Sequence, residues 1–234
     1  MKQILILVLL FSFFTSCLQM QKGIVTFSEA SPEVFTKLSL RKFFQSNPNP
    51  KIVLRVPQSA KDATSEEFFS QSDVYNAIEK ELLKSGFNVR DRGLFNEVLK
   101  KPTTTDYSKI HDLTDTDIIL ELVSLRTDVE YNTNKYVTPK KGTKRKLSSG
   151  GITLYGASAE FKIILIKSNE VAGSYQFNYA PCTQGCGYYI NEQGNVFKRS
   201  KGKMAEIPSY EFIETDFLVE FMSESTKELI EYLE

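Results

Sequence analysis

The order of apolar and polar positions along this chain predicts strands that alternate with helices. Short apolar runs predict strands over 51–56, 87–89, 117–125, 152–166 and 171–179. Apolar residues at helical spacing predict helices over 34–44, 65–85, 92–101 and 209–233. Because strands and helices are mixed and the last two strands are joined by only four residues, we expect an α/β (α+β) fold. It has a central mixed β-sheet with helices packed on it, an antiparallel hairpin and a long C-terminal helix.

Residues 127–150 interrupt this pattern with a polar segment that we expect to be a loop. No acidic residue follows Glu130 within it, and it is rich in cations. The loop offers possible contacts to anionic lipid headgroups or to an acidic partner. The candidate residues for these contacts are Lys135, Tyr136, Lys140, Lys141, Lys144, Arg145 and Lys146. The alternative is that the charge run is only a solvated surface.

The first seventeen residues have the layout of a bacterial export signal. Lys2 supplies a basic start, residues 4–14 form an apolar stretch, and two small residues precede Cys17. Residues 14–17 resemble a lipobox, which implies cleavage before Cys17 and covalent lipid on that cysteine. One alternative is an ordinary secretory signal with an incidental cysteine. The other is a transmembrane anchor, but the apolar stretch is shorter than the 20 or so residues that a membrane span needs.

The predicted anchor sets the expected domain boundaries. We expect a lipoprotein signal peptide over 1–16, a tether and N-terminal segment over 17–45, and a single α/β domain over 46–234. Without its signal the chain carries 28 Lys and Arg (29 less Lys2) against 29 Asp and Glu, a net charge near −1. This balance gives no reason to expect nucleic acid as a partner. We expect a membrane-anchored lipoprotein of the cell envelope, held at the outer membrane and facing the periplasm.

Two of the three cysteines are close together in sequence. Outside the cytoplasm, the spacing of Cys182 and Cys186 predicts a local disulfide across a turn, with two free thiols or a metal site as alternatives. A closed zinc site needs further soft ligands, and His111 is the only histidine, so we expect no metal and no cofactor beyond the lipid on Cys17. We expect His111 in an exposed loop. A catalytic triad with a serine and a nearby aspartate is the alternative, but no nucleophile motif accompanies it.

A further pattern lies between the first two long predicted helices. Gly86, Phe87, Val89, Asp91 and Arg92 follow the order small residue, Phe, x, Val, x, acid, Arg. With the strands around it, this order resembles the strand–helix–strand–helix–strand module of the curli-secretion lipoproteins. The same module occurs in the penicillin-binding-protein activator lipoproteins and in the amino-terminal domain of the Tol-system periplasmic protein. The likeness covers about residues 50–181 and the closing helix, and it implies a role in envelope assembly, secretion or the regulation of wall synthesis.

These features favour a binding protein over an enzyme. We expect a lipid-anchored, non-enzymatic envelope adaptor that binds another envelope protein and contacts the membrane through its lipid. The alternative is an oligomeric subunit of an outer-membrane secretion or assembly complex. An enzyme is the least favoured class, because the chain has one histidine and no catalytic motif.

Overall fold

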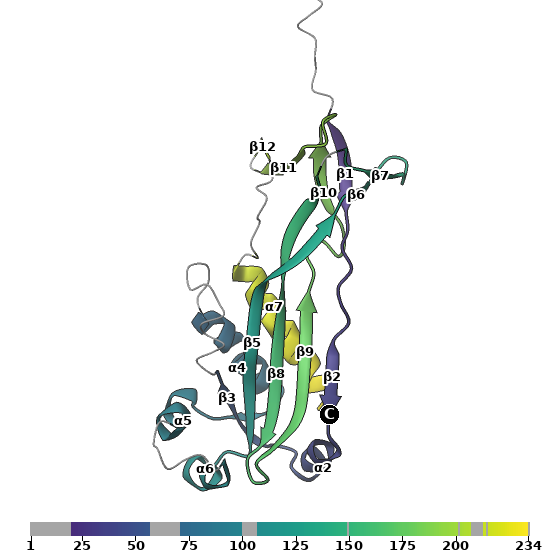
Figure 1. Ribbon diagram of the computed structural model, residues 1–234. Coiled ribbons are helices and arrows are strands. Elements are labelled where there is room, and N and C mark those ends of the chain that lie inside the picture. The colour runs from purple at the N-terminus through teal and green to yellow at the C-terminus, as the bar shows by residue number, and fades with distance from the viewer. Residues whose placement is uncertain are drawn as a thin grey trace, which may run out of the picture. The chain divides into compact units, whose positions relative to one another are not determined.

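The chain forms two compact units, each built around its own sheet (Figure 1). The computed structural model describes residues 20–56, 71–99, 107–148, 150–200, 202–206, 213 and 215–233. Unit 1 takes the described residues within 1–27, 132–153 and 182–211, and unit 2 takes those within 28–131, 154–181 and 212–234. The predicted α+β class is confirmed. The single domain predicted over 46–234 is corrected, since two stretches of it pair with the N-terminal strand in a separate sheet.

Unit 2 is built on a mixed six-stranded sheet with the strand order β2-β9-β8-β5-β3-β4. The strands are β2 (Glu33–Thr36), β3 (Lys51–Arg55), β4 (Asn88–Val89), β5 (Ile118–Thr133), β8 (Ile152–Leu165) and β9 (Glu170–Tyr179). β3 pairs in parallel with β4 and β5, whereas β9 pairs antiparallel with β8 and β2. The predicted hairpin is therefore β8–β9, and the parallel strands β4, β3 and β5 lie at the other side of the sheet.

Helices cover both faces of the parallel strands. The helices are α2 (Leu38–Ser46), α4 (Gln71–Lys84), α5 (Arg92–Leu99), α6 (Tyr107–Thr114) and α7 (Thr215–Glu231). Ile52 and Leu54 of β3 join a core cluster with residues of α4 and α7, whereas Val53 joins a second cluster with Phe95 of α5 and Ile110 of α6. Alternate residues of one strand thus enter opposite cores, as expected of a strand buried on both faces.

The predicted helices differ from the observed ones in their bounds. The helix predicted over 65–85 is seen as α4, with 57–70 outside the described residues, and the closing helix is described only from Thr215. The helix predicted over 34–44 is corrected. Its first part is β2, which pairs with β9, and α2 begins at Leu38. Among the helices described, none has the length and apolar character needed to cross a membrane.

Unit 1 is an antiparallel sheet with the strand order β12-β11-β10-β1-β6-β7. The strands are β1 (Gln21–Val25), β6 (Lys135–Val137), β7 (Lys144–Lys146), β10 (Cys186–Ile190), β11 (Val196–Ser200) and β12 (Lys203–Glu206). Its buried apolar side chains include Val25, Tyr136, Leu147, Tyr188 and Ile190. The tether and N-terminal segment predicted over 17–45 contains β1, β2 and α2.

The loop predicted over 127–150 is also regular structure. β5 continues to Thr133, and β6 and β7 then form a hairpin. Its turn is closed by hydrogen bonds from the Gly142 amide to the Thr138 carbonyl (2.9 Å) and from the Thr138 amide to the Thr143 carbonyl (3.0 Å). Gly142 has a φ of 59°, a conformation that glycine adopts without strain. Most side chains of β6 and β7 are exposed and cationic, so their polar sequence resembled a loop.

Candidate functional site

The two units carry opposite net charge. The segments assigned to unit 1 hold 12 Lys and Arg against 3 Asp and Glu, a net charge of +9 by count. The rest of the chain then holds 17 cations (29 less 12) and 26 acids (29 less 3), a net charge of −9. Removal of Lys2 with the predicted signal changes unit 1 only to +8. The near-zero charge of the whole chain therefore conceals a strongly basic sheet.

The strand register of unit 1 assigns most of these cations to a particular face. Residues paired across antiparallel strands lie on the same face, and so do alternate residues of one strand. Ile24 of β1 pairs with Val137 of β6, and Val137 pairs with Lys144 of β7. Lys135 and Lys146 lie two positions from these residues and pair with each other, so they share that face.

The same face continues across the other half of the sheet. Lys22 lies two positions before Ile24 and pairs with Tyr189, which pairs with Phe197 of β11. Arg199 lies two positions beyond Phe197 on the same strand. We call this surface the cationic face. Its cations are Lys22, Lys135, Lys144, Lys146 and Arg199, and all five are exposed.

Apolar side chains lie between the cations. Ile24, Val137, Tyr189 and Phe197 are half-buried, and Met204, the partner of Arg199 in the ladder, is 40% exposed. A shallow hollow of about 400 Å³ lies at the β1–β6–β7 end. Its lining includes Ile24, Thr26 and Val137 together with the three lysines of β6 and β7 that the cationic face contains. The cationic face therefore combines an apolar floor with a rim of amines.

One pair on the cationic face is electrostatically unfavourable as it stands. Lys135 and Lys146 are directly opposite each other in the β6–β7 ladder, and like charges in that position destabilise a sheet. An anion bound between the two ammonium groups would remove this repulsion.

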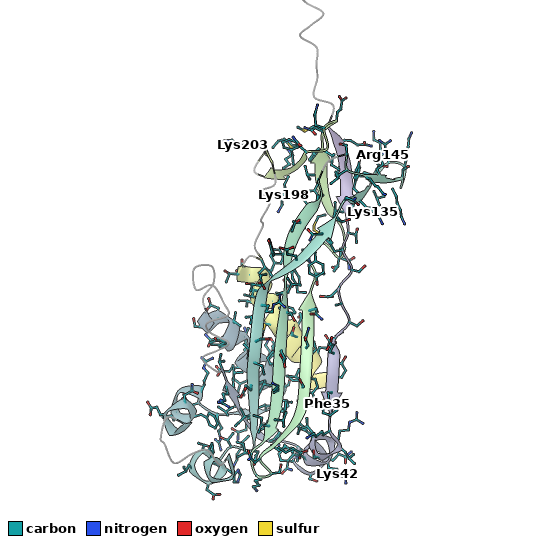
Figure 2. The ribbon with its side chains drawn as sticks, in the orientation of Figure 1. Phe35, Lys42, Lys135, Arg145, Lys198 and Lys203 are labelled. Carbon is teal, nitrogen blue, oxygen red and sulfur yellow. A yellow bond between two sulfur atoms is a disulfide. The ribbon has the colours of Figure 1, made fainter. Side chains whose placement is uncertain are left out.

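The structure separates the residues that the sequence grouped as one contact site. Lys135, Lys144 and Lys146 lie on the cationic face, and Lys140 and Lys141 are exposed in the hairpin turn. Figure 2 labels Lys135 and Arg145 in this part of unit 1.

Two members of that group, Arg145 and Tyr136, differ from the others in their placement. Arg145 lies on the opposite face, where its Nη1 donates a hydrogen bond to Gln21 Oε1 (3.1 Å). Tyr136 is only 7% exposed and belongs to the core of unit 1, and both it and Arg145 are among the residues that line the hollow. Its ring lies against Gly23, where an added Cβ would come within 2.7 Å of Tyr136 Cδ2.

Sequence reasoning missed Lys22 and Arg199. They lie far along the chain from residues 135–146 and reach the same face only through strand pairing. No local pattern marks them. The absence of acids from residues 132–153 was visible in the sequence, but the charge balance of the whole chain concealed its significance.

The predicted disulfide is confirmed. Cys182 and Cys186 are bonded across a turn with their Cα atoms 5.1 Å apart. The Gly185 amide donates to the Cys182 carbonyl (2.9 Å), and Gly185 has a φ of 90°. The bond fixes the turn that leads into β10. Within the described part of the chain, no group of three or more His, Cys, Asp or Glu residues is arranged to hold a metal ion.

His111 does not lie in an exposed loop, and that prediction is corrected. It lies on α6 and is half-buried, and its Nδ1 donates to the Thr116 carbonyl (2.7 Å). Asp117 Oδ2 accepts the Lys51 backbone amide (3.0 Å), and Asp115 is paired with Lys51 Nζ and Arg90 Nη2, each at 2.5 Å. The hydrogen bond from Lys51 lowers the pKa of Asp115 below its usual value. These contacts connect the starts of β3 and β5, which is a structural role.

A second exposed surface lies on unit 2. β2 is at the end of the strand order, so among the described strands it has a neighbour on one side only. Val34 and Phe35 on this strand are 39% and 58% exposed, and Leu38 at the start of α2 is 65% exposed. Figure 2 labels Phe35 on this strand. We call Val34, Phe35 and Leu38 the apolar edge, within which Val34 and Phe35, as successive strand residues, lie on opposite faces of the sheet.

A hollow of about 600 Å³ also lies in unit 2, next to α2. Its walls include Phe44, Phe87 and Tyr232 together with the oppositely charged Arg41 and Glu231. This mixture of charges and aromatic rings selects no particular ligand chemistry, so we assign none to it.

Comparisons with known proteins give little further guidance. No family model matches the chain, and no curated protein matches it. Among solved structures, the chain is similar to a PDZ domain protein from Parabacteroides distasonis, with 9% sequence identity and a TM-score of 0.29. The similarity covers 77% of this chain and 41% of the other, so the chain spans about two fifths of that protein's length. At this level of similarity, it carries no argument about function.

Proposed function

We propose that this protein is a lipid-anchored, non-enzymatic adaptor of the bacterial cell envelope that binds another envelope protein through β2. The observation that supports this function is the apolar edge, three large apolar side chains exposed on and beside an edge strand. The lipid anchor comes from the lipobox-like residues 14–17, which lie outside the described residues. A role in envelope assembly, secretion or wall-synthesis regulation comes from the resemblance carried by residues 86–92.

The partner would supply an extended segment that adds to the sheet next to β2. An edge strand directs part of its backbone N–H and C=O groups away from the sheet, where a further strand can pair with them. Side chains of that segment would cover Phe35 and Leu38. Full burial of one large apolar side chain contributes about 1.5–3 kcal/mol, so these two residues would be the main anchors.

The test is capture of the partner from solubilised membranes by the lipidated protein, with bound proteins identified by mass spectrometry. The variant Leu38→Asp should lose the captured protein, because it places a charge in the apolar contact. Leu113→Asp is the matched control, since Leu113 on α6 is 64% exposed in the same unit. Equal capture by both variants would show that the apolar edge is not the binding surface.

The same sample tests the anchor. Mass spectrometry of the purified protein should find residues 1–16 removed and lipid on Cys17. An unmodified Cys17 or retained residues 1–16 would refute the anchor. The binding function would then still be decided by the capture experiment.

The alternative function is an oligomeric subunit of an outer-membrane secretion or assembly complex. The same edge favours it, because β2 of one copy can pair with β2 of a second copy. The mass of the detergent-solubilised protein at high concentration separates the two. A monomeric mass would exclude the oligomeric subunit. A larger assembly that the variant Leu38→Asp dissociates would favour the oligomeric subunit over the adaptor.

A further inference from the structure

We infer that the cationic face of unit 1 binds the phosphate headgroups of an anionic phospholipid bilayer. The cationic face presents Lys22, Lys135, Lys144, Lys146 and Arg199 on four strands of one small sheet, β1, β6, β7 and β11. β10, which lies between β1 and β11, contributes Tyr189. A cation near an anionic membrane surface contributes about 1 kcal/mol of attraction, so several on one face give a specific orientation.

The place of β1 in the chain brings this face near a membrane. Gln21, where β1 begins, is only four positions after Cys17 (21 less 17). A chain of that length spans at most about 14 Å when fully extended. This step rests on the lipid anchor of the proposed function. A lipid at Cys17 would then hold unit 1 within reach of the headgroups, where electrostatic attraction acts over roughly 8–10 Å at physiological salt.

The chemistry of the face suits a bilayer surface. The amines of Lys135, Lys144 and Lys146 surround the hollow of about 400 Å³, which is large enough for a phosphate group. Its apolar floor and the neighbouring half-buried Tyr189 and Phe197 suit the boundary between headgroups and acyl chains, where aromatic side chains gather. A headgroup phosphate between Lys135 and Lys146 would also relieve their mutual repulsion.

The contact would orient the protein at the membrane. A lipid on a short tether restricts the distance of unit 1 from the bilayer but leaves the unit free to rotate. Contact through the cationic face would select one of the orientations that the tethered unit can adopt. This is a task that the acyl chains cannot perform by themselves, however strongly they insert.

The test uses the mature chain with Cys17→Ser, so that neither lipid nor an envelope partner contributes. It should sediment with vesicles that contain phosphatidylglycerol and remain free with vesicles of phosphatidylcholine alone. Its binding should weaken as salt is raised. Loss of partner capture in Leu38→Asp would leave this result unchanged, so the two proposals can fail separately.

A pair of double variants tests the face itself. Lys135→Glu with Lys146→Glu should weaken vesicle binding by about 25-fold or more, at roughly fivefold per cation. Lys198→Glu with Lys203→Glu is the matched control, because it makes the same change of net charge on the opposite face of the sheet. Figure 2 labels both control lysines. The control should retain most of the binding.

Three results would overturn the inference. These are equal loss of binding in both double variants, equal binding to both kinds of vesicle, and no binding at low salt. If Lys135→Glu with Lys146→Glu does not fold by circular dichroism, Lys22→Gln with Arg199→Gln replaces it and should weaken binding as well. Capture of an acidic protein by the cationic face, with no vesicle binding, would assign the face to that protein instead.

Discussion

At the scale of single residues, Glu81 of α4 joins two helices of unit 2. Its side chain is buried, with 4% exposure, and it accepts hydrogen bonds from Lys84 Nζ (2.6 Å) and from Ser223 Oγ of α7 (2.7 Å). The hydrogen bond from Lys84, followed by that from Ser223, lowers the pKa of Glu81 below its usual value. The ionised carboxylate is therefore the form that stabilises the packing of α4 on α7.

The variant Glu81→Gln should lower the free energy of unfolding at pH 7 by about 1 kcal/mol, since it loses the charge on these hydrogen bonds. Because the folded pKa lies below the unfolded one, Glu81 contributes stability above about pH 4.3, and this contribution is lost as pH falls through the folded pKa. Urea unfolding of the variant and the wild type at pH 7 and at pH 3 measures the difference in their free energy of unfolding at each pH. A difference between variant and wild type that persists undiminished at pH 3 would contradict this role.

The sequence alone was sufficient to predict the role of some residues and insufficient for others. The Cys182–Cys186 bond was predictable because both partners are close in sequence and the turn between them holds a glycine. Tyr136 follows a cation in sequence and pairs with Arg145 in the ladder, yet its ring lies against Gly23 and is buried in unit 1. Alternation places successive residues of a strand on opposite faces, so adjacency in sequence was misleading here.

At the scale of elements, the predictable strands and helices are those with a buried side. β3, β8 and β9 were predicted close to their observed bounds, since their apolar residues enter the cores of unit 2. β6 and β7 were missed, because their cationic residues face solvent. These segments form strands because they pair with other segments, such as β1 far away in sequence. The order of apolar and polar residues within one segment does not predict such pairing.

The disulfide should stabilise the turn before β10. Closing so short a loop is expected to contribute about 2 kcal/mol by the chain-entropy relation. Replacing both cysteines, Cys182→Ser with Cys186→Ser, should therefore speed amide hydrogen exchange in β10 and in its partner β1. β9 serves as the internal control within the same molecule. Unchanged exchange in β10 would show that the strand pairing, and not the disulfide, holds this turn.

At the scale of the whole molecule, the main feature is the separation of charge between two units. The sequence reported a balanced chain with a pI near 6.6. That balance is an average over a unit of +9 and a unit of −9 by count. It could not reveal the basic sheet, because the assignment of each segment to a unit depends on contacts between residues far apart in sequence.

This separation predicts unusual behaviour in ion exchange. A chain with a net charge near zero should pass through a cation exchanger at pH 7, yet the mature protein should be retained at low salt by unit 1. Lys135→Glu with Lys146→Glu should elute at lower salt. Passage of the wild-type protein through the column unretained would contradict the exposure of these cations.

The pairing of β1 with β10 also determines when unit 1 can form. Gln21 and Ile190 are partners in the ladder although they are 169 positions apart (190 less 21). During synthesis, β1 emerges early and must wait for residues 186–190 before it gains this partner. Contacts so distant in sequence are slow to form. Unit 1 would therefore be among the last parts of the molecule to fold, although it contains the first strand of the chain.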